Sequence, residues 1–187
     1  MSTILVIGDS YAAGKEGDTG KERGWPDIMG IPTYLRQGIG GSTTAEWFQD
    51  KNQRLTKAMR TPSEVLIVSL LGSDALNGAV TPDQTITGIE ELHVVVSKCM
   101  SDGMWNKNTF VFLYPDPFLG KSKKTRKMIP LVNRAIRIAC YGMPVALIDL
   151  FALLTDSRCF TGKDIHPTRY GHQLIADYIR NVKKISV

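Results

Sequence analysis

The sequence predicts an α/β fold, a three-layer α/β/α sandwich built around a parallel sheet of about five strands. Three observations support this prediction: five short apolar runs, amphipathic helical segments between them, and alternation of the two along all 187 residues. Such alternation is typical of parallel sheets whose crossover helices pack on both faces. Because single cores commonly run to roughly 200 residues, we expect residues 1–187 to form one domain.

The first expected strand is the apolar run at residues 4–7, which is typical of a strand buried on both faces. Gly8 ends it, and a short helical turn is expected after Ser10. A second strand is expected within residues 31–39, where several glycines close it. A capping-box pattern that begins at Thr43 then predicts a helix to about Arg60.

The second half of the chain repeats this alternation. Three more apolar runs predict strands, and helical spacing of apolar residues predicts the helices between and after them. The strands are expected at 64–71, 110–114 and 144–149, and the helices at about 82–100, 125–140 and 168–183. Pro130 is expected near the first turns of its helix.

Composition excludes several classes of protein. No apolar stretch approaches the roughly 20 residues that span a bilayer, and no basic segment precedes Ile4 as in a signal peptide. We therefore expect synthesis in the cytoplasm and no membrane partner, while export by another route stays open. The net charge of +5 indicates anionic partners. The basic run at 121–127 lacks interleaved aromatic residues, so no nucleic acid is expected.

The three cysteines are Cys99, Cys140 and Cys159, an odd number at wide spacing. This spacing indicates reduced core cysteines and neither a disulfide framework nor a zinc site. No other residue set has metal-ligand spacing and no phosphate-binding loop is present, so no cofactor or metal is expected.

Small polar residues follow three of the expected strands: Gly8-Asp9-Ser10, Gly40-Gly41-Ser42 and Gly72-Ser73-Asp74. A fourth polar segment, Asp164-Ile165-His166-Pro167, precedes the last helix. The carboxyl ends of parallel strands are where ligands gather, so these segments are expected to lie together. Ser10 is then a candidate nucleophile, with a plain helix-capping role for Asp9-Ser10 as the alternative.

In order and spacing, these blocks resemble the SGNH/GDSL hydrolase superfamily over nearly the whole chain. The resemblance implies a flavodoxin-like fold and a serine esterase. Ser10 would attack an ester carbonyl, and His166 would take its proton and return it to the leaving alcohol. The implied oxyanion donors are the N–H groups of Ser10 and Gly41 and a side chain from the third block.

The chain departs from the family pattern twice. The third block carries Ser73 where the family has Asn, and its hydroxyl is shorter than an amide; Asn77 is a candidate substitute. The family places Asp three residues before the His, a position that Lys163 occupies here. Either the Asp164 carboxylate or the backbone carbonyl of Lys163 is then expected to orient His166.

The resulting hypothesis is hydrolysis of an O-acyl ester, such as an acetyl ester, of a carbohydrate or small molecule. The rival hypothesis is a binding or structural module that keeps the fold and has lost catalysis, and transfer of the acyl group to an acceptor other than water is a third. Asp9 is expected to fix the turn before Ser10, and Trp25 and Trp47 are expected to lie in the core. His172 is expected to be a packing or capping residue and not a second base.

Overall fold

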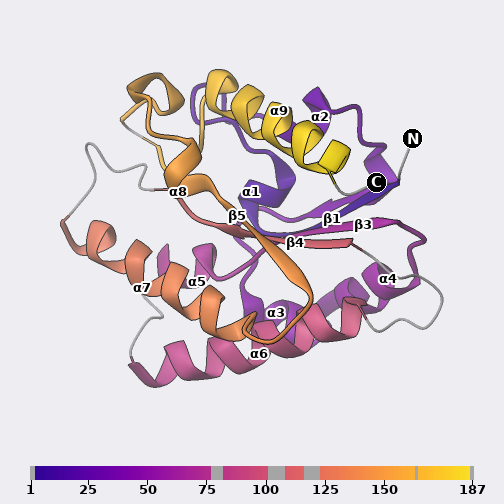
Figure 1. Ribbon diagram of the computed structural model, residues 1–187. Helices are drawn as coiled ribbons and strands as arrows, with labels where there is room; N and C mark the ends of the chain where they lie inside the picture. The colour runs from indigo at the N-terminus through magenta and orange to yellow at the C-terminus, as the bar shows by residue number, and fades with distance from the viewer. Residues whose placement is uncertain (1–2, 77–81, 101–107, 116–122, 163, 186–187) are drawn as a thin grey trace.

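The computed structural model describes residues 3–76, 82–100, 108–115, 123–162 and 164–185, and it confirms the predicted α/β architecture (Figure 1). Within these ranges, parallel strands form one sheet in the order β2-β1-β3-β4-β5. The strands are β1 (Ile4–Gly8), β2 (Arg36–Gly38), β3 (Val65–Ser69), β4 (Asn108–Leu113) and β5 (Val145–Asp149).

Helices cover both faces of this sheet, which gives the three layers (Figure 1). One face carries α1 (Ser10–Ala13), α2 (Trp25–Ile28) and α9 (Arg169–Ile185), with α8 (Leu150–Leu153) beside α9. The other face carries α3 (Thr44–Phe48), α4 (Arg54–Arg60), α5 (Gly72–Leu76), α6 (Pro82–Met100) and α7 (Lys123–Ala139). Short 3₁₀ turns occupy Thr33–Leu35, Lys51–Gln53 and Ser157–Cys159.

The core lies in the two layers between the sheet and its helices. Trp25 and Trp47 are fully buried, as predicted, and the Trp25 ring meets Phe112 of β4 edge-on at 5.5 Å. Cys99, Cys140 and Cys159 are free and buried, which confirms the expectation of core thiols. No helix in the described ranges is both long enough and apolar enough to cross a membrane.

Strand β1 is buried at every position and pairs with β2 on one side and β3 on the other. At its end, Gly8 has φ +130°, and a Cβ there would lie 1.9 Å from the Ser69 carbonyl oxygen. Only glycine allows this close approach of β1 to β3. The strand order reverses at β1, and in sheets of this kind ligands bind in the crevice at that point. Ser10 follows directly.

Three predicted elements needed correction. The second strand was expected within 31–39 but spans only Arg36–Gly38, because the 3₁₀ turn Thr33–Leu35 occupies its first half. The helix expected from Thr43 to Arg60 is two helices, separated by left-handed backbone at Asp50 and beyond. Pro130 lies inside α7 and not in its first turns.

Candidate active site

Ser10 lies at the carboxyl end of β1, as the first residue of α1. Asp9 caps this helix, because its Oδ1 accepts a hydrogen bond from the Tyr11 N–H at 3.0 Å. The Asp9 N–H donates to the Ser69 carbonyl oxygen of β3 at 2.9 Å. These bonds fix the turn that carries Ser10, which is the structural role the sequence predicted for Asp9.

The Asp9 carboxylate also belongs to a buried network that the sequence analysis missed. Ser69 Oγ donates to Asp9 Oδ1 at 3.0 Å, and Tyr114 Oη donates to Asp9 Oδ2 at 2.5 Å. Burial raises the pKa of Asp9 to about 6, although these hydrogen bonds favour the carboxylate and oppose the shift. Ser69 and Tyr114 stand at or just beyond the ends of β3 and β4, and that placement is the signal that could have found them.

The structure brings Ser10 and His166 together. His166 Nε2 lies 2.8 Å from Ser10 Oγ, and its Nδ1 lies 2.5 Å from Asp164 Oδ1. Both Ser10 and His166 are buried. When Nδ1–H donates to the carboxylate, Nε2 is the unprotonated nitrogen, and it can accept the proton of the Ser10 hydroxyl.

A local turn explains how Asp164 serves His166 from only two residues away. Asp164 Oδ1 also accepts the backbone N–H of His166 at 3.0 Å, so the side chain folds over its own loop as an Asx turn. Burial would raise the pKa of Asp164, but the hydrogen bonds from His166 and its charge outweigh burial and lower it. Lys163, the other candidate for orienting His166, lies outside the described residues.

Helix α1 and the loop after it support the segment that carries His166. Tyr11 Oη donates to the Ile165 carbonyl at 2.5 Å, and the Gly17 N–H donates to the Pro167 carbonyl at 2.8 Å. A Cβ at Gly17 would lie 2.2 Å from the His166 carbonyl oxygen, so the two backbones touch. No sequence motif indicated this contact, because it joins segments about 150 residues apart.

His172 and Glu16 anchor the same loop to α9. His172 is buried, its Nε2–H donates to the Lys15 carbonyl at 2.9 Å, and burial lowers its pKa to about 4. It therefore packs in the interior, one of its two predicted roles, and does so as a neutral imidazole. Buried Glu16 accepts hydrogen bonds from Arg169 at 3.1 Å and Thr19 at 2.6 Å. Burial opposes ionisation of Glu16, but these donors prevail and its pKa is lowered.

The second and third blocks form the other wall of the site. Gly41 follows β2 in the left-handed conformation, with φ +76°. Ser42 Oγ donates to the Gly8 carbonyl at 3.0 Å, so this turn is fixed to the end of β1. Ser73 is buried in the first turn of α5, and a Cβ at the preceding Gly72 would lie 2.9 Å from Asp9 Oδ2. Asn77 lies outside the described residues.

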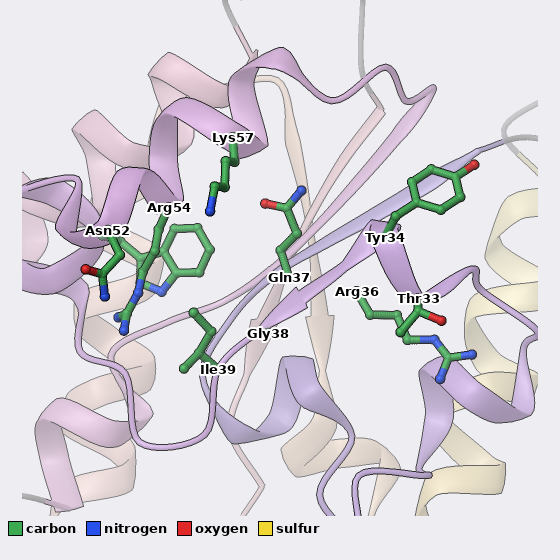
Figure 2. Close-up of a pocket in the computed structure, with 10 residues that line it drawn as sticks. Thr33, Tyr34, Arg36, Gln37, Gly38, Ile39, Asn52, Arg54 and Lys57 are labelled. Carbon is green, nitrogen blue, oxygen red and sulfur yellow. The ribbon is translucent and has the colours of Figure 1, made fainter.

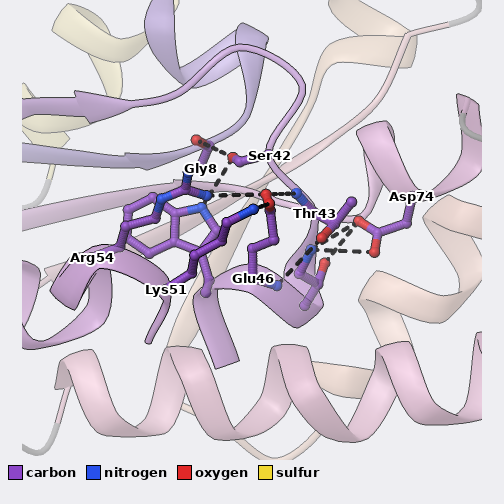
Figure 3. Close-up of polar contacts among 9 residues, drawn as sticks. Gly8, Ser42, Thr43, Glu46, Lys51, Arg54 and Asp74 are labelled. Carbon is purple, nitrogen blue, oxygen red and sulfur yellow. Dashed lines mark hydrogen bonds and ion pairs between the residues drawn. The ribbon is translucent and has the colours of Figure 1, made fainter. Parts of the chain in front are cut away.

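Asp74 joins these two blocks to each other (Figure 3). Its carboxylate accepts the Thr44 N–H at 3.0 Å and the Thr44 hydroxyl at 3.1 Å, at the start of α3. The capping box predicted for Thr43 and Glu46 is present, with Thr43 as the residue that caps α3. Burial raises the pKa of Asp74 against these hydrogen bonds. Among the described residues, no cluster of His, Cys, Asp or Glu has the arrangement of a metal site.

Residues 6–174 match the model of the GDSL-like lipase/acylhydrolase family. A comparison with curated protein sequences found no match. Solved structures of hydrolases share the fold at low sequence identity. One is described as a lipolytic protein of the G-D-S-L family from Desulfitobacterium hafniense DCB-2. It has a TM-score of 0.71 and 17% identity, over 97% of this chain and 99% of that chain.

Two further structures are similar to this chain over nearly their whole length. One is a mutant of Axe2, an acetylxylan esterase from Geobacillus stearothermophilus, with a TM-score of 0.67 and 13% identity over 96% of this chain and 93% of that chain. The other is the psychrotrophic esterase EstA from Pseudoalteromonas sp., inhibited by monoethylphosphonate. It has a TM-score of 0.67 and 17% identity over 98% of both chains.

Proposed function

The chain belongs to the GDSL-like lipase/acylhydrolase family and is a serine hydrolase, and on this premise we propose that it cleaves an O-acyl ester through an acyl-enzyme at Ser10. The observation that carries the proposal is the 2.8 Å separation between His166 Nε2 and Ser10 Oγ. That distance is within hydrogen-bond reach of a general base and its nucleophile.

In the first half of the proposed reaction, Ser10 Oγ attacks the ester carbonyl carbon while His166 Nε2 takes its proton. The Asp164 carboxylate holds the imidazole in the required tautomer and stabilises the imidazolium that forms. The C–O bond to the alcohol then breaks, and His166 returns the proton to the leaving oxygen. In the second half, water attacks the acyl-Ser10 carbonyl carbon while His166 Nε2 takes its proton. The bond between that carbon and Ser10 Oγ then breaks, His166 returns the proton to Oγ, and the acid is released.

The tetrahedral intermediates carry a negative oxygen that needs hydrogen-bond donors. We assign the N–H groups of Ser10 and Gly41 to this role, and the Ser73 hydroxyl as a third candidate donor. The N–H of Ser10 is at the start of α1, where helix geometry leaves it without an intrahelical acceptor. In the described part of the chain, neither N–H donates to a backbone acceptor. One such donor is worth about 3 kcal/mol in comparable sites.

For the substrate, we propose an acylated carbohydrate or small ester, with acetyl as the first acyl group to test. The structural similarity to an acetylxylan esterase supports this choice. The net charge of +5 favours a carrier with negative charge.

A phosphonate probe tests the proposal directly, and the neighbour inhibited by monoethylphosphonate supports the choice of reagent. Wild-type protein incubated with a fluorophosphonate should gain the mass of one adduct, and Ser10→Ala should gain none. No wild-type adduct, under conditions that label a known serine esterase, would favour the non-catalytic module. An adduct that persists in Ser10→Ala would place the nucleophile elsewhere. Hydrolysis of p-nitrophenyl esters and acetylated sugars then identifies the acyl group and carrier.

A further inference from the structure

A hollow of about 400 Å³ lies along the free edge of the sheet, between β2 and α4 (Figure 2). We call it the β2-edge hollow. Its size falls within the range of about 300–1,000 Å³ that is usual for small-ligand sites. Its polar and apolar lining includes Arg36, Gln37, Ile39, Asn52, Arg54 and Lys57.

The lining carries positive charge without any carboxylate. Arg36, Arg54 and Lys57 contribute the cations, and none of the described residues that line the hollow is Asp or Glu. Lys57 is exposed, and its ammonium has no polar partner among the described residues. Figure 2 shows its side chain extending from α4 toward the strand edge, beside Gln37. An unpaired ammonium in an open hollow is available to an anionic ligand.

The two arginines are held in place from outside the hollow. Arg36 donates from Nε to the Ile31 carbonyl at 2.5 Å and from a terminal nitrogen to Asp27 at 3.1 Å. Arg54 donates to Glu46 at 3.0 Å, and its side chain is only 13% exposed (Figure 3). Each guanidinium has five N–H donors, so both keep donors free while their orientation is fixed. Arg54 lies on the same side of β2 as Lys57, whereas Arg36 points to the other side (Figure 2). Such preorganised forks match the geometry of a carboxylate.

The backbone on the α4 side is in an unfavourable conformation. Asn52 and Gln53 have φ values of +56° and +57°, in the left-handed region that non-glycine residues rarely occupy. Non-glycine residues in this region concentrate at ligand-binding segments. The Asn52 side chain is exposed, without a polar partner among the described residues, and can hydrogen-bond a sugar hydroxyl.

Gly38 and Ile39, which line one end of the hollow, are bonded to the end of β1. Gly38 pairs with Gly8 in the sheet register, and the Ile39 N–H donates to the Gly8 carbonyl at 2.8 Å. Neighbouring strands are only about 4.8 Å apart, so Ile39 lies one strand away from the turn that carries Ser10. Gly41, the assigned oxyanion donor, follows two residues later.

From these observations we propose that the β2-edge hollow binds a negatively charged sugar unit of the acylated substrate and thereby positions its ester at Ser10. The proposal rests on the esterase function above and specifies its substrate class. A carboxylate or sulfate on the sugar would contact Lys57 and the free donors of Arg54, while Gln37 and Asn52 would bind hydroxyl groups.

Binding to Ser10→Ala tests this proposal without requiring hydrolysis. We would titrate the variant calorimetrically with three oligosaccharides of equal length: an oligogalacturonate, a sulfated oligosaccharide and a neutral xylo-oligosaccharide. At least one anionic oligosaccharide should bind about tenfold more tightly than the neutral one, with weaker binding at higher salt. The anionic oligosaccharide that binds more tightly shows whether the site prefers a carboxylate or a sulfate. Equal affinity for all three, or no binding, would overturn the proposal even if phosphonate labelling succeeds.

Variants in the Ser10→Ala background locate the binding site. Lys57→Gln should weaken anionic binding about tenfold, the loss of one charge-assisted contact. Arg60→Gln is the matched control, because this substitution removes one positive charge from the same helix and Arg60 does not line the hollow. Asn52→Gly removes the amide but tolerates positive φ, so weaker binding there would not reflect misfolding. Equal losses in Lys57→Gln and Arg60→Gln would indicate general electrostatics and refute the site.

Discussion

Asp164 Oδ1 contacts His166 twice, at 2.5 Å from the ring Nδ1 and at 3.0 Å from the backbone nitrogen. One carboxylate oxygen therefore shapes the loop and orients the imidazole at the same time. The family pattern places the orienting Asp one residue earlier, where this chain has Lys163. The Asx turn brings this carboxylate to Nδ1 while Nε2 lies 2.8 Å from Ser10 Oγ.

Replacing Asp164 with Asn should lower kcat for ester hydrolysis about a thousandfold, because a neutral amide cannot stabilise the imidazolium. Steady-state kinetics on a p-nitrophenyl ester measures this effect, with KM nearly unchanged. Asp156→Asn is the control, since that carboxylate is paired with exposed Arg158 and lies outside the proposed machinery. Retained kcat in Asp164→Asn would transfer the orienting role to another group, such as the Lys163 carbonyl.

Asp9 should make folding stability depend on pH between about 4 and 6. Its folded pKa is raised to about 6 from an ordinary value of 3.8, so the folded state binds more protons across this window. The free energy of unfolding should then fall by roughly 3 kcal/mol as pH rises through the window. Urea denaturation of wild type and Asp9→Asn at several pH values isolates this contribution as a difference. Parallel pH profiles for the two proteins would contradict it.

Gly17→Ala should lower kcat about a hundredfold, because its Cβ would lie 2.2 Å from the His166 carbonyl oxygen and displace the base by about an ångström. Gly20→Ala in the same loop is the matched control. Gly20 has φ +69°, but a Cβ there would have no atom of the described residues within 4 Å apart from its chain neighbours, so alanine costs about 1–2 kcal/mol of stability without reaching His166. Similar kcat losses in both variants would show that loop stability, and not this contact, is what matters.

Arg169→Met should lower the free energy of unfolding by about 1–3 kcal/mol, because it removes a donor from the buried Glu16 carboxylate. Chemical denaturation at pH 7 measures the change. Arg137→Met is the comparison, since its ion pair with Asp149 is exposed on both sides and is worth less than about 1 kcal/mol. Equal effects of the two substitutions would mean that burial of Glu16 adds nothing.

The sequence sufficed for the elements whose signal is local. Buried strands are recognisable as apolar runs, and the capping box at Thr43 and Glu46 is a short motif with its own geometry. The break between α3 and α4 escaped prediction because neither glycine nor proline marks it: Asp50, Asn52 and Gln53 take up left-handed backbone. Pro130 lies inside α7, whereas the predicted helix start at about residue 125 places it near the first turns.

The residues of the candidate site also differ in whether a local sequence motif marks them. Ser10, His166 and Asp164 stand in short motifs, and the structure places them within hydrogen-bond distance of one another in series. Tyr114 stands in no motif, and only the sheet order places it beside Asp9. Such contacts depend on the order of the strands in the sheet, and a single sequence carries little information about that order.

The 156 positions that separate Ser10 from His166 also bear on how the protein is made. On the ribosome, Ser10 is therefore synthesised 156 residues before His166. The nascent chain therefore carries Ser10 without its proposed base until residues 164–166 have been added, and the proposed hydrolysis can begin only once that segment lies beside the end of β1.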